Sequence, residues 1–135
     1  MSFVSVIQAI RPEPTQESNM QYLCLIYANE SVEPAPGTPE FDALIGEYMA
    51  FSERVTKDGV FVAGEALQPV AMATTVTNEN GKTETMDGPF AETKEQLGGF
   101  YLLDCKDLDE ALKYAAMIPS TKHGRVEVRP TIVFD

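Results

Sequence analysis

The chain has 135 residues, the length of one domain, and 44% of them are hydrophobic and 23% charged, a composition that excludes an intrinsically disordered protein. Its 21 acidic and 10 basic residues give a net charge of −11, which repels nucleic acids and anionic membrane surfaces, so we expect neither as a partner. A negatively charged ligand would need local cations, for which Lys94, Arg125 and Arg129 are the candidates.

The first predicted boundary separates a polar extension from the domain. Residues 1–19 end in the proline-bearing segment RPEPTQESN, so we expect the domain to span residues 20–135. Within the extension, Phe3 to Ile10 form a short apolar patch that predicts a strand or arm against a neighbouring subunit. Residues 21–27, QYLCLIY, then predict a central strand that is covered on both faces.

A long helix is predicted next. Thr38 can cap it, Pro39 suits its first position, and Gly59 supplies its end. Between these signals, apolar residues recur at helical spacing and predict a stripe that faces a sheet: Phe41, Leu44, Ile45, Tyr48, Phe51 and Val55.

The remaining elements are predicted to be mainly strands. They are a strand over residues 60–67, a hairpin over residues 71–86 that turns at Asn80 and Gly81, a strand over residues 99–105, a helix that begins at the capping box of Asp107 and Glu110, and a final strand over residues 125–134. Without the hairpin, the order is that of the ferredoxin-like βαββαβ fold, an α+β architecture with both helices on one face of an antiparallel sheet. Because the other face would lack a cover, we expect a homodimer that joins two sheets face to face.

The two cysteines and the chain's motifs give no sign of a metal or cofactor. Cys24 and Cys105 lie far apart in apolar runs, so we expect reduced core thiols and no zinc site or disulfide framework. The sequence has no phosphate-cradling glycine motif and no dinucleotide fingerprint. It also has no convincing signal peptide and no apolar run long enough to span a bilayer, so we expect a cytoplasmic protein.

Residues 86–104, MDGPFAETKEQLGGFYLLD, strongly resemble the DGPF motif of the YCII-related protein family. The segments QYLCLIY, VFVAGEALQP, ATTV and GRVEVRP fit the same family, so the resemblance covers about residues 20–133. It implies a ferredoxin-like fold that pairs into a dimeric α/β barrel, with no settled reaction. Some relatives are encoded with or fused to extracytoplasmic-function sigma factors, which implies a regulatory alternative. Many members carry a histidine and an aspartate near the presumed cleft, whereas the single histidine here, His123, lies in the turn STKHG.

Two carboxylates are the candidate acid and base groups. Asp87 begins the tight turn DGPF, where it serves either the turn itself or a cleft, and the sequence gives both roles equal weight. Glu65 lies in an otherwise apolar strand, so we expect it to be buried with a partner. For His123 we favour a solvated surface position over a general base.

The candidate binding residues lie on the final strand and in the motif loop. Glu127 and Arg129 alternate with valines, so they share one face and either orient a ligand in the intersubunit cleft or form a structural ion pair, which we slightly favour. Glu92 and Lys94 belong to a segment that predicts one helical turn, either solvated or placed over the barrel mouth to bind an anionic group. Tyr101 can join either arrangement, and we expect Phe90 to pack under the loop.

These residues leave three hypotheses: a small-molecule enzyme that uses the dimer cleft and the DGPF loop, a metabolite-binding or regulatory module without turnover, and a chain whose cleft is filled by its own side chains. The charged motif loop favours the first two. Between enzyme and binding module the sequence does not decide, since this architecture hosts unrelated chemistries.

Overall fold

The computed structural model describes residues 19–134, so the arm predicted over Phe3 to Ile10 lies outside the described residues. The main sheet is antiparallel and has the strand order β2-β5-β1-β6. Its strands are β1 (Met20–Ala28), β2 (Phe61–Ala66), β5 (Gln96–Cys105) and β6 (Arg125–Pro130). The described residues also contain helices α2 (Pro39–Lys57) and α3 (Leu108–Ala115), the hairpin of β3 (Thr74–Glu79) and β4 (Lys82–Asp87), and the short 3-10 helices η1 (Glu30–Val32), η2 (Val70–Met72) and η3 (Pro119–Lys122).

The order β1, α2, β2, β5, α3, β6 is the predicted one, and it is compatible with a ferredoxin-like fold. The helix signals are confirmed: the Thr38 hydroxyl accepts the N–H of Phe41 at 3.2 Å, and Gly59 follows α2 with a φ of +75°. The N-cap half of the predicted capping box is confirmed, because Asp107 Oδ1 accepts the N–H of Glu110 at 2.9 Å, whereas the Glu110 carboxylate accepts the N–H of Lys106 at 3.2 Å and not that of Asp107.

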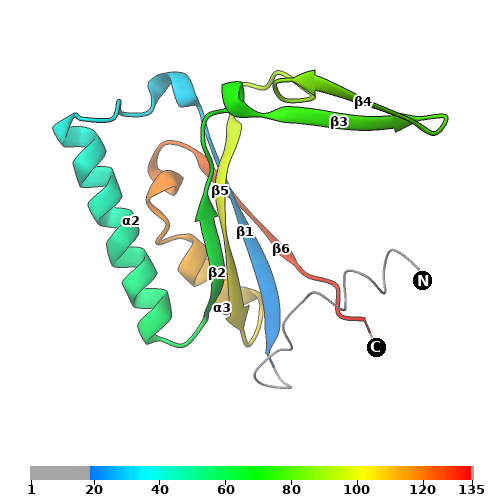
Figure 1. Ribbon diagram of the computed structural model, residues 1–135. Coiled ribbons are helices and arrows are strands. Elements are labelled where there is room, and N and C mark those ends of the chain that lie inside the picture. Colours follow the sequence, from blue (N-terminus) through cyan, green and yellow to red (C-terminus); the bar gives the residue numbers. More distant parts are fainter. Residues whose placement is uncertain (1–18, 135) are drawn as a thin grey trace.

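Both helices pack on the same face of the sheet (Figure 1). The core on that face consists of buried side chains from alternate strand positions, from the helices and from the loops beside them: Tyr22, Cys24, Ile26, Phe51, Val55, Val60, Tyr101, Leu103, Cys105, Ala111, Ala115 and Ile118. Val126 and Val128 of β6 pack against this core, as the alternation in the final strand predicts. Both cysteines are buried and free, and burial raises the pKa of the Cys24 thiol to about 11 and that of Cys105 to about 12.

No helix of residues 19–134 covers the opposite face of the sheet, and we call this surface the uncovered face. Its centre is apolar and only partly buried, since Leu23 pairs with Leu102 and Leu25 with Phe100. On the β6 side, Arg129 and Glu127 lie opposite Leu23 and Leu25, and both are exposed. The prediction of a sheet with helices on one face is therefore confirmed.

The β3 and β4 hairpin projects from one end of the sheet (Figure 1). Asn80 and Gly81 have φ values of 54° and 81°, as a two-residue hairpin turn requires. At its base, the Gly88 N–H donates to the Ala73 carbonyl at 2.7 Å.

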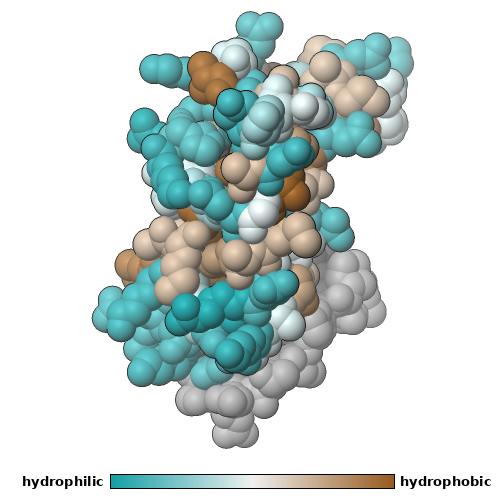
Figure 2. All heavy atoms as spheres, turned by 90° about the vertical axis from the view of Figure 1, so that its left-hand side faces the viewer, coloured by the Kyte–Doolittle hydropathy of each residue, from teal (hydrophilic) through white to brown (hydrophobic). Residues whose placement is uncertain are grey.

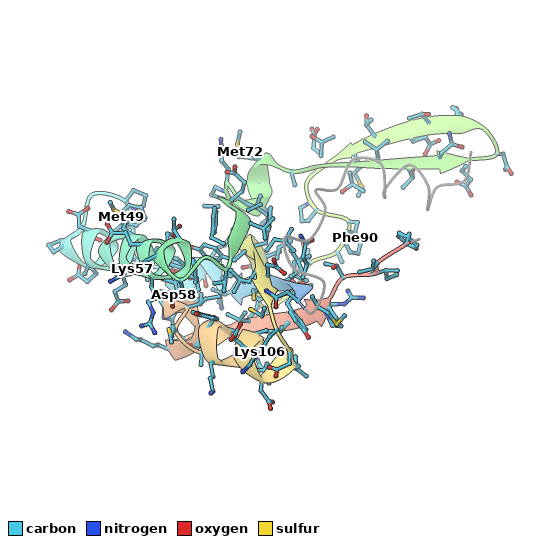
Figure 3. The ribbon with its side chains drawn as sticks, turned by 90° about the horizontal axis from the view of Figure 1, so that it is seen from below. Met49, Lys57, Asp58, Met72, Phe90 and Lys106 are labelled. Atoms are coloured by element: carbon cyan, nitrogen blue, oxygen red, sulfur yellow. The ribbon has the colours of Figure 1, made fainter. Side chains whose placement is uncertain are left out.

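Two expectations for the motif loop are wrong. Residues 92–95 form a loop and no helical turn, because side chains bond its backbone: Gln96 Nε2 donates to the Thr93 carbonyl at 2.6 Å. Phe90 does not pack under the loop, since 85% of it is exposed (Figure 3).

Candidate functional site

The described residues enclose a cavity of about 780 Å³ between α2 and the sheet, which we call the α2 cavity. Phe41, Leu44 and Ile45 line it from the N-terminal half of α2. The facing wall includes Ile26 of β1 and Phe61 of β2. Its volume lies within the range of about 300 to 1,000 Å³ that is typical of small-molecule sites. The cavity lies on the helix-covered side of the sheet, not on the uncovered face.

The apolar stripe of α2 has two different partners along its length. Near the C-terminal end, Phe51 and Val55 are buried in the core. Near the N-terminal end, Ile45 lines the cavity and is 41% exposed. Figure 2 faces the α2 side of the molecule and shows hydrophobic surface between more hydrophilic regions. The first turns of α2 therefore present apolar side chains to open space rather than to the core.

Hydroxyl groups gather at one part of the cavity wall. Ser52 Oγ and the Tyr101 hydroxyl lie 2.8 Å apart and share a hydrogen bond, and both residues line the cavity. Tyr48 lies one helical turn before Ser52, and burial raises the pKa of its phenol, while the neighbouring Ser120 lowers it. The three hydroxyls can donate and accept hydrogen bonds in an otherwise apolar space.

The Tyr101 ring is held in place by two aromatic neighbours. Its centroid lies 4.9 Å from that of Phe51 and 6.3 Å from that of Phe61, each at an interplanar angle of 72°. Such edge-on pairs contribute about 0.5 to 1.5 kcal/mol beyond their buried area. The position of the Tyr101 hydroxyl is therefore fixed by the core.

Two glycines make the wall between β2 and β5 close-packed. A Cβ atom on Gly99 would lie 2.8 Å from the Glu65 carbonyl oxygen, and one on Gly64 would lie 2.9 Å from Cδ1 of Tyr101. Both residues line the cavity. The close approach is confined to Gly99, because Gly98 has open space beside it.

Glu30 holds the rim of the cavity together. Its N–H donates to Gln96 Oε1 at 2.9 Å, and its carboxylate accepts the N–H of Val70 at 3.1 Å. These bonds connect η1 with the start of β5 and with η2. Within the motif stretch, the residues that line the cavity are Gln96, Gly98, Gly99, Phe100 and Tyr101.

Of the residues predicted from the sequence, Tyr101 and Glu65 line the α2 cavity. Glu65 is exposed, so the expectation of a buried carboxylate with a partner is wrong: it lies opposite Phe100 on the edge strand β2, and its side chain therefore points to the uncovered face and not into the cavity. Within residues 19–134 its side chain forms no hydrogen bond or ion pair.

Asp87, Glu92 and Lys94 are exposed and do not line this cavity. Asp87 lies at the end of β4, and the other two lie in the loop that follows. Their predicted roles in a cleft between two chains stay predictions.

His123 and the β6 pair have carboxylate partners. His123 is exposed, as expected, and its Nε2 lies 3.5 Å from Oε1 of Glu33, a residue that lines the α2 cavity. On the uncovered face, Arg129 Nε lies 3.8 Å from Oε2 of Glu127, and both side chains are exposed. Sequence reasoning missed Glu33, Tyr48 and Ser52 as cavity residues, although the stripe that carries Tyr48 was visible.

Neither a metal centre nor a membrane span is found in the described part of the chain. No three metal-ligating side chains of residues 19–134 gather where they could hold an ion. In the same range, none of the helices combines the length and the hydropathy needed to cross a bilayer.

The comparisons with known proteins agree with the resemblance of the motif. The YCII-related domain matches residues 20–135. An uncharacterized protein of Rhizobium meliloti (strain 1021) is 41% identical over 119 residues, which cover 85% of this chain and 94% of that protein. The chain therefore belongs to the YCII-related domain family.

Proposed function

We propose that this YCII-related protein binds a small, mostly apolar molecule in the α2 cavity. The observation that carries the proposal is the cavity itself, an apolar space of about 780 Å³ that is lined by Tyr48 and by the bonded hydroxyls of Ser52 and Tyr101. Three of its apolar lining residues, Ile45, Phe61 and Leu67, are exposed. Exposed apolar side chains around a concave site are typical of ligand-binding surfaces, because a ligand removes them from water.

An enzymatic role is the second candidate, and the pair of His123 and Glu33 favours it. A histidine beside a carboxylate is an arrangement that general acid–base catalysis uses. Glu33 lines the cavity, so a bound molecule would lie near the pair. The sequence-based candidate Asp87 would take part only if a second chain brought its hairpin to a cavity.

We also infer a homodimer through the uncovered face, in which two sheets pair into an α/β barrel. Support comes from the partly buried apolar centre of that face, formed by Leu23, Leu25, Phe100 and Leu102. Exposed charges of both signs border it, with Glu65 on β2 and Arg129 on β6. Two copies related by a twofold axis could therefore place opposite charges around an apolar centre. The assignment to the DGPF subgroup rests on residues 86–100 alone.

The binding proposal can be tested by filling the cavity mouth. Ile45→Trp places a larger ring at the cavity, whereas Met49→Trp places the same ring one turn further along α2, where Met49 is 61% exposed and does not line the cavity (Figure 3). We expect N-phenyl-1-naphthylamine, a neutral fluorescent probe, to bind the parent chain and the Met49→Trp variant, and to bind Ile45→Trp at least about tenfold more weakly.

Two results would contradict the proposal. One is equal binding of the probe to both tryptophan variants, which would place it elsewhere. The other is a loss of binding in Asp87→Asn with Ile45→Trp unaffected, which would favour a site at the hairpin. To separate a binding protein from an enzyme, a bound compound is incubated with the protein and analysed by mass spectrometry for conversion.

A further inference from the structure

We propose that the α2 cavity recognises uncharged molecules that combine an apolar body with a carbonyl oxygen, an inference that rests on the proposed function. The bonded hydroxyls of Ser52 and Tyr101 would donate a hydrogen bond to the carbonyl, and the apolar body would lie along the first turns of α2.

The pair of Ser52 and Tyr101 keeps one hydroxyl hydrogen for a ligand. The two oxygens lie 2.8 Å apart, and either of them can be the donor of the bond that they share. Each hydroxyl carries a single hydrogen, so the shared bond uses the hydrogen of one partner. Neither hydroxyl has another hydrogen-bond partner within residues 19–134. Whichever hydroxyl donates, the hydrogen of the other is therefore available to an acceptor in the cavity.

The carboxylates of the cavity wall do not offer a free counter-charge to a ligand. Glu30 accepts a backbone N–H of η2, Glu33 lies beside His123, and the side chain of Glu65 points to the uncovered face. No lysine, arginine or histidine of residues 19–134 lines the cavity, so an anion would meet no cation there. A charged group that leaves water for this apolar space would lose its hydration without a partner to offset the loss, which favours a neutral ligand.

Other uncharged polar side chains of the wall already face protein groups. Gln96 Oε1 accepts the N–H of Glu30 at 2.9 Å, and Gln96 Nε2 donates to the Thr93 carbonyl at 2.6 Å. Burial raises the pKa of the Tyr48 phenol and the neighbouring Ser120 lowers it, so this oxygen faces a protein hydroxyl. In the described part of the chain, the bonded hydroxyl pair can thus bind a ligand without giving up a contact to the protein.

The donor is held at a fixed place in an apolar wall. The Tyr101 ring packs edge-on against Phe51 and Phe61, and Ser52 belongs to the helix that covers it. A hydrogen bond in such surroundings is stronger than in water, because the local dielectric constant is lower. A ligand without an acceptor would expel water and leave the hydroxyl hydrogen unpaired, which carries a free-energy penalty. The pair should therefore favour a carbonyl compound over a hydrocarbon of the same shape.

Three compounds with the same phenylethyl body test the inference at neutral pH, each in competition with N-phenyl-1-naphthylamine. The first is the ketone 4-phenyl-2-butanone. In the second, the alkene 2-methyl-4-phenyl-1-butene, a methylene group replaces the ketone oxygen. In the third, 3-phenylpropanoate, a carboxylate replaces the ketone group.

The parent chain is compared with the double variant Ser52→Ala/Tyr101→Phe, which removes both hydroxyls and keeps the aromatic ring. We expect the ketone to bind the double variant about tenfold more weakly than the parent chain. The alkene should bind the double variant at least as tightly as the parent chain, because its site becomes more apolar. The carboxylate should bind the parent chain at least about tenfold more weakly than the ketone does.

Tyr114→Phe is the matched control, because it removes a phenol hydroxyl outside the cavity, one that donates to Asp58 at 2.8 Å. It should keep the affinities of the parent chain. A second measurement needs no variant: infrared difference spectra should show the carbonyl stretch of the bound ketone at a lower wavenumber than in hexane, as a hydrogen bond to the oxygen requires.

The inference is overturned if the ketone binds the parent chain and the double variant equally, if the alkene loses as much affinity as the ketone, if the carboxylate competes as well as the ketone, or if the carbonyl stretch stays at its position in hexane. If Ile45→Trp weakens the probe in these cases, the proposed function stands without the inference. If none of the compounds competes and Ile45→Trp binds the probe as tightly as the parent chain, the proposed function fails as well.

Discussion

The contact between β2 and β5 makes a sharp prediction about two adjacent glycines. Gly99→Ala would place a methyl group 2.8 Å from the Glu65 carbonyl oxygen and 3.3 Å from the Ala66 Cα atom. Both are backbone atoms, and Ala66 is the strand partner of Gly99, so neither can move without disturbing the ladder. Overpacking of this kind typically costs about 1 to 3 kcal/mol.

Gly98→Ala is the control from the neighbouring position. No atom lies within 4 Å of a Cβ there, and its φ is not in the left-handed region. The change restricts the unfolded chain, which stabilises the folded state by about 0.4 to 1 kcal/mol where the backbone is compatible. The two alanine variants should therefore differ in free energy of unfolding by about 2 kcal/mol or more.

Urea unfolding followed by circular dichroism measures this difference. With a slope of about 2 kcal/mol per molar urea, the midpoint of Gly99→Ala should lie about 1 M below that of Gly98→Ala. Protein concentration is kept the same, because assembly would add to the apparent stability. Equal midpoints would show that the β2 and β5 backbones are not as close as 2.8 Å implies, and the wall of the α2 cavity would then need to be revised.

Two further predictions concern the uncovered face and the core thiols. In sedimentation experiments, the parent chain should have the mass of a dimer and Leu25→Arg the mass of a monomer, whereas Met49→Arg on α2 should remain a dimer. A parent chain that is monomeric at high concentration would contradict the dimer. Burial raises the pKa of Cys24 from 9.0 to about 11 and that of Cys105 from 9.0 to about 12, so above pH 9 the unfolded chain loses thiol protons that the folded chain keeps. Stability should therefore fall as pH rises from 9 toward 11, by up to about 1.4 kcal/mol per pH unit for each thiol, and Cys24→Ala should make the decline shallower in urea titrations at several pH values.

Local signals were sufficient for most of the fold. Thr38, the pair Asn80 and Gly81, and Asp107 each specify an element boundary through bonds or dihedral angles within a few residues, so the sequence alone reveals them. The alternation of Glu127 with the valines of β6 predicted, for the same reason, that the charged residues and the valines lie on opposite faces of the strand, and the structure places the valines against the core. Such short-range rules do not depend on how distant segments meet.

The wrong predictions depended on distant segments. Glu65 was expected to be buried because its strand reads as apolar, yet β2 is at the edge of the sheet. Phe90 was expected inside its loop, but the loop bonds itself and β6 instead, with Glu95 2.9 Å from Arg125. The edge position of a strand and the direction of a loop are properties of the whole topology, which the local composition does not contain.

The α2 cavity exists because the strands carry small residues opposite the large side chains of α2. Large residues of α2, such as Phe41 and Leu44, face a sheet surface where Gly64, Gly99 and Ala28 line the cavity. At Gly64 and Gly99 the neighbouring atoms leave no room for a Cβ, so a larger side chain cannot fill the space from those positions. The helix stripe alone could not reveal this, because residues that bury against a core and residues that line a cavity have the same spacing. Small residues in consecutive paired strands opposite a helix stripe are thus the sequence signal for an open site in this chain.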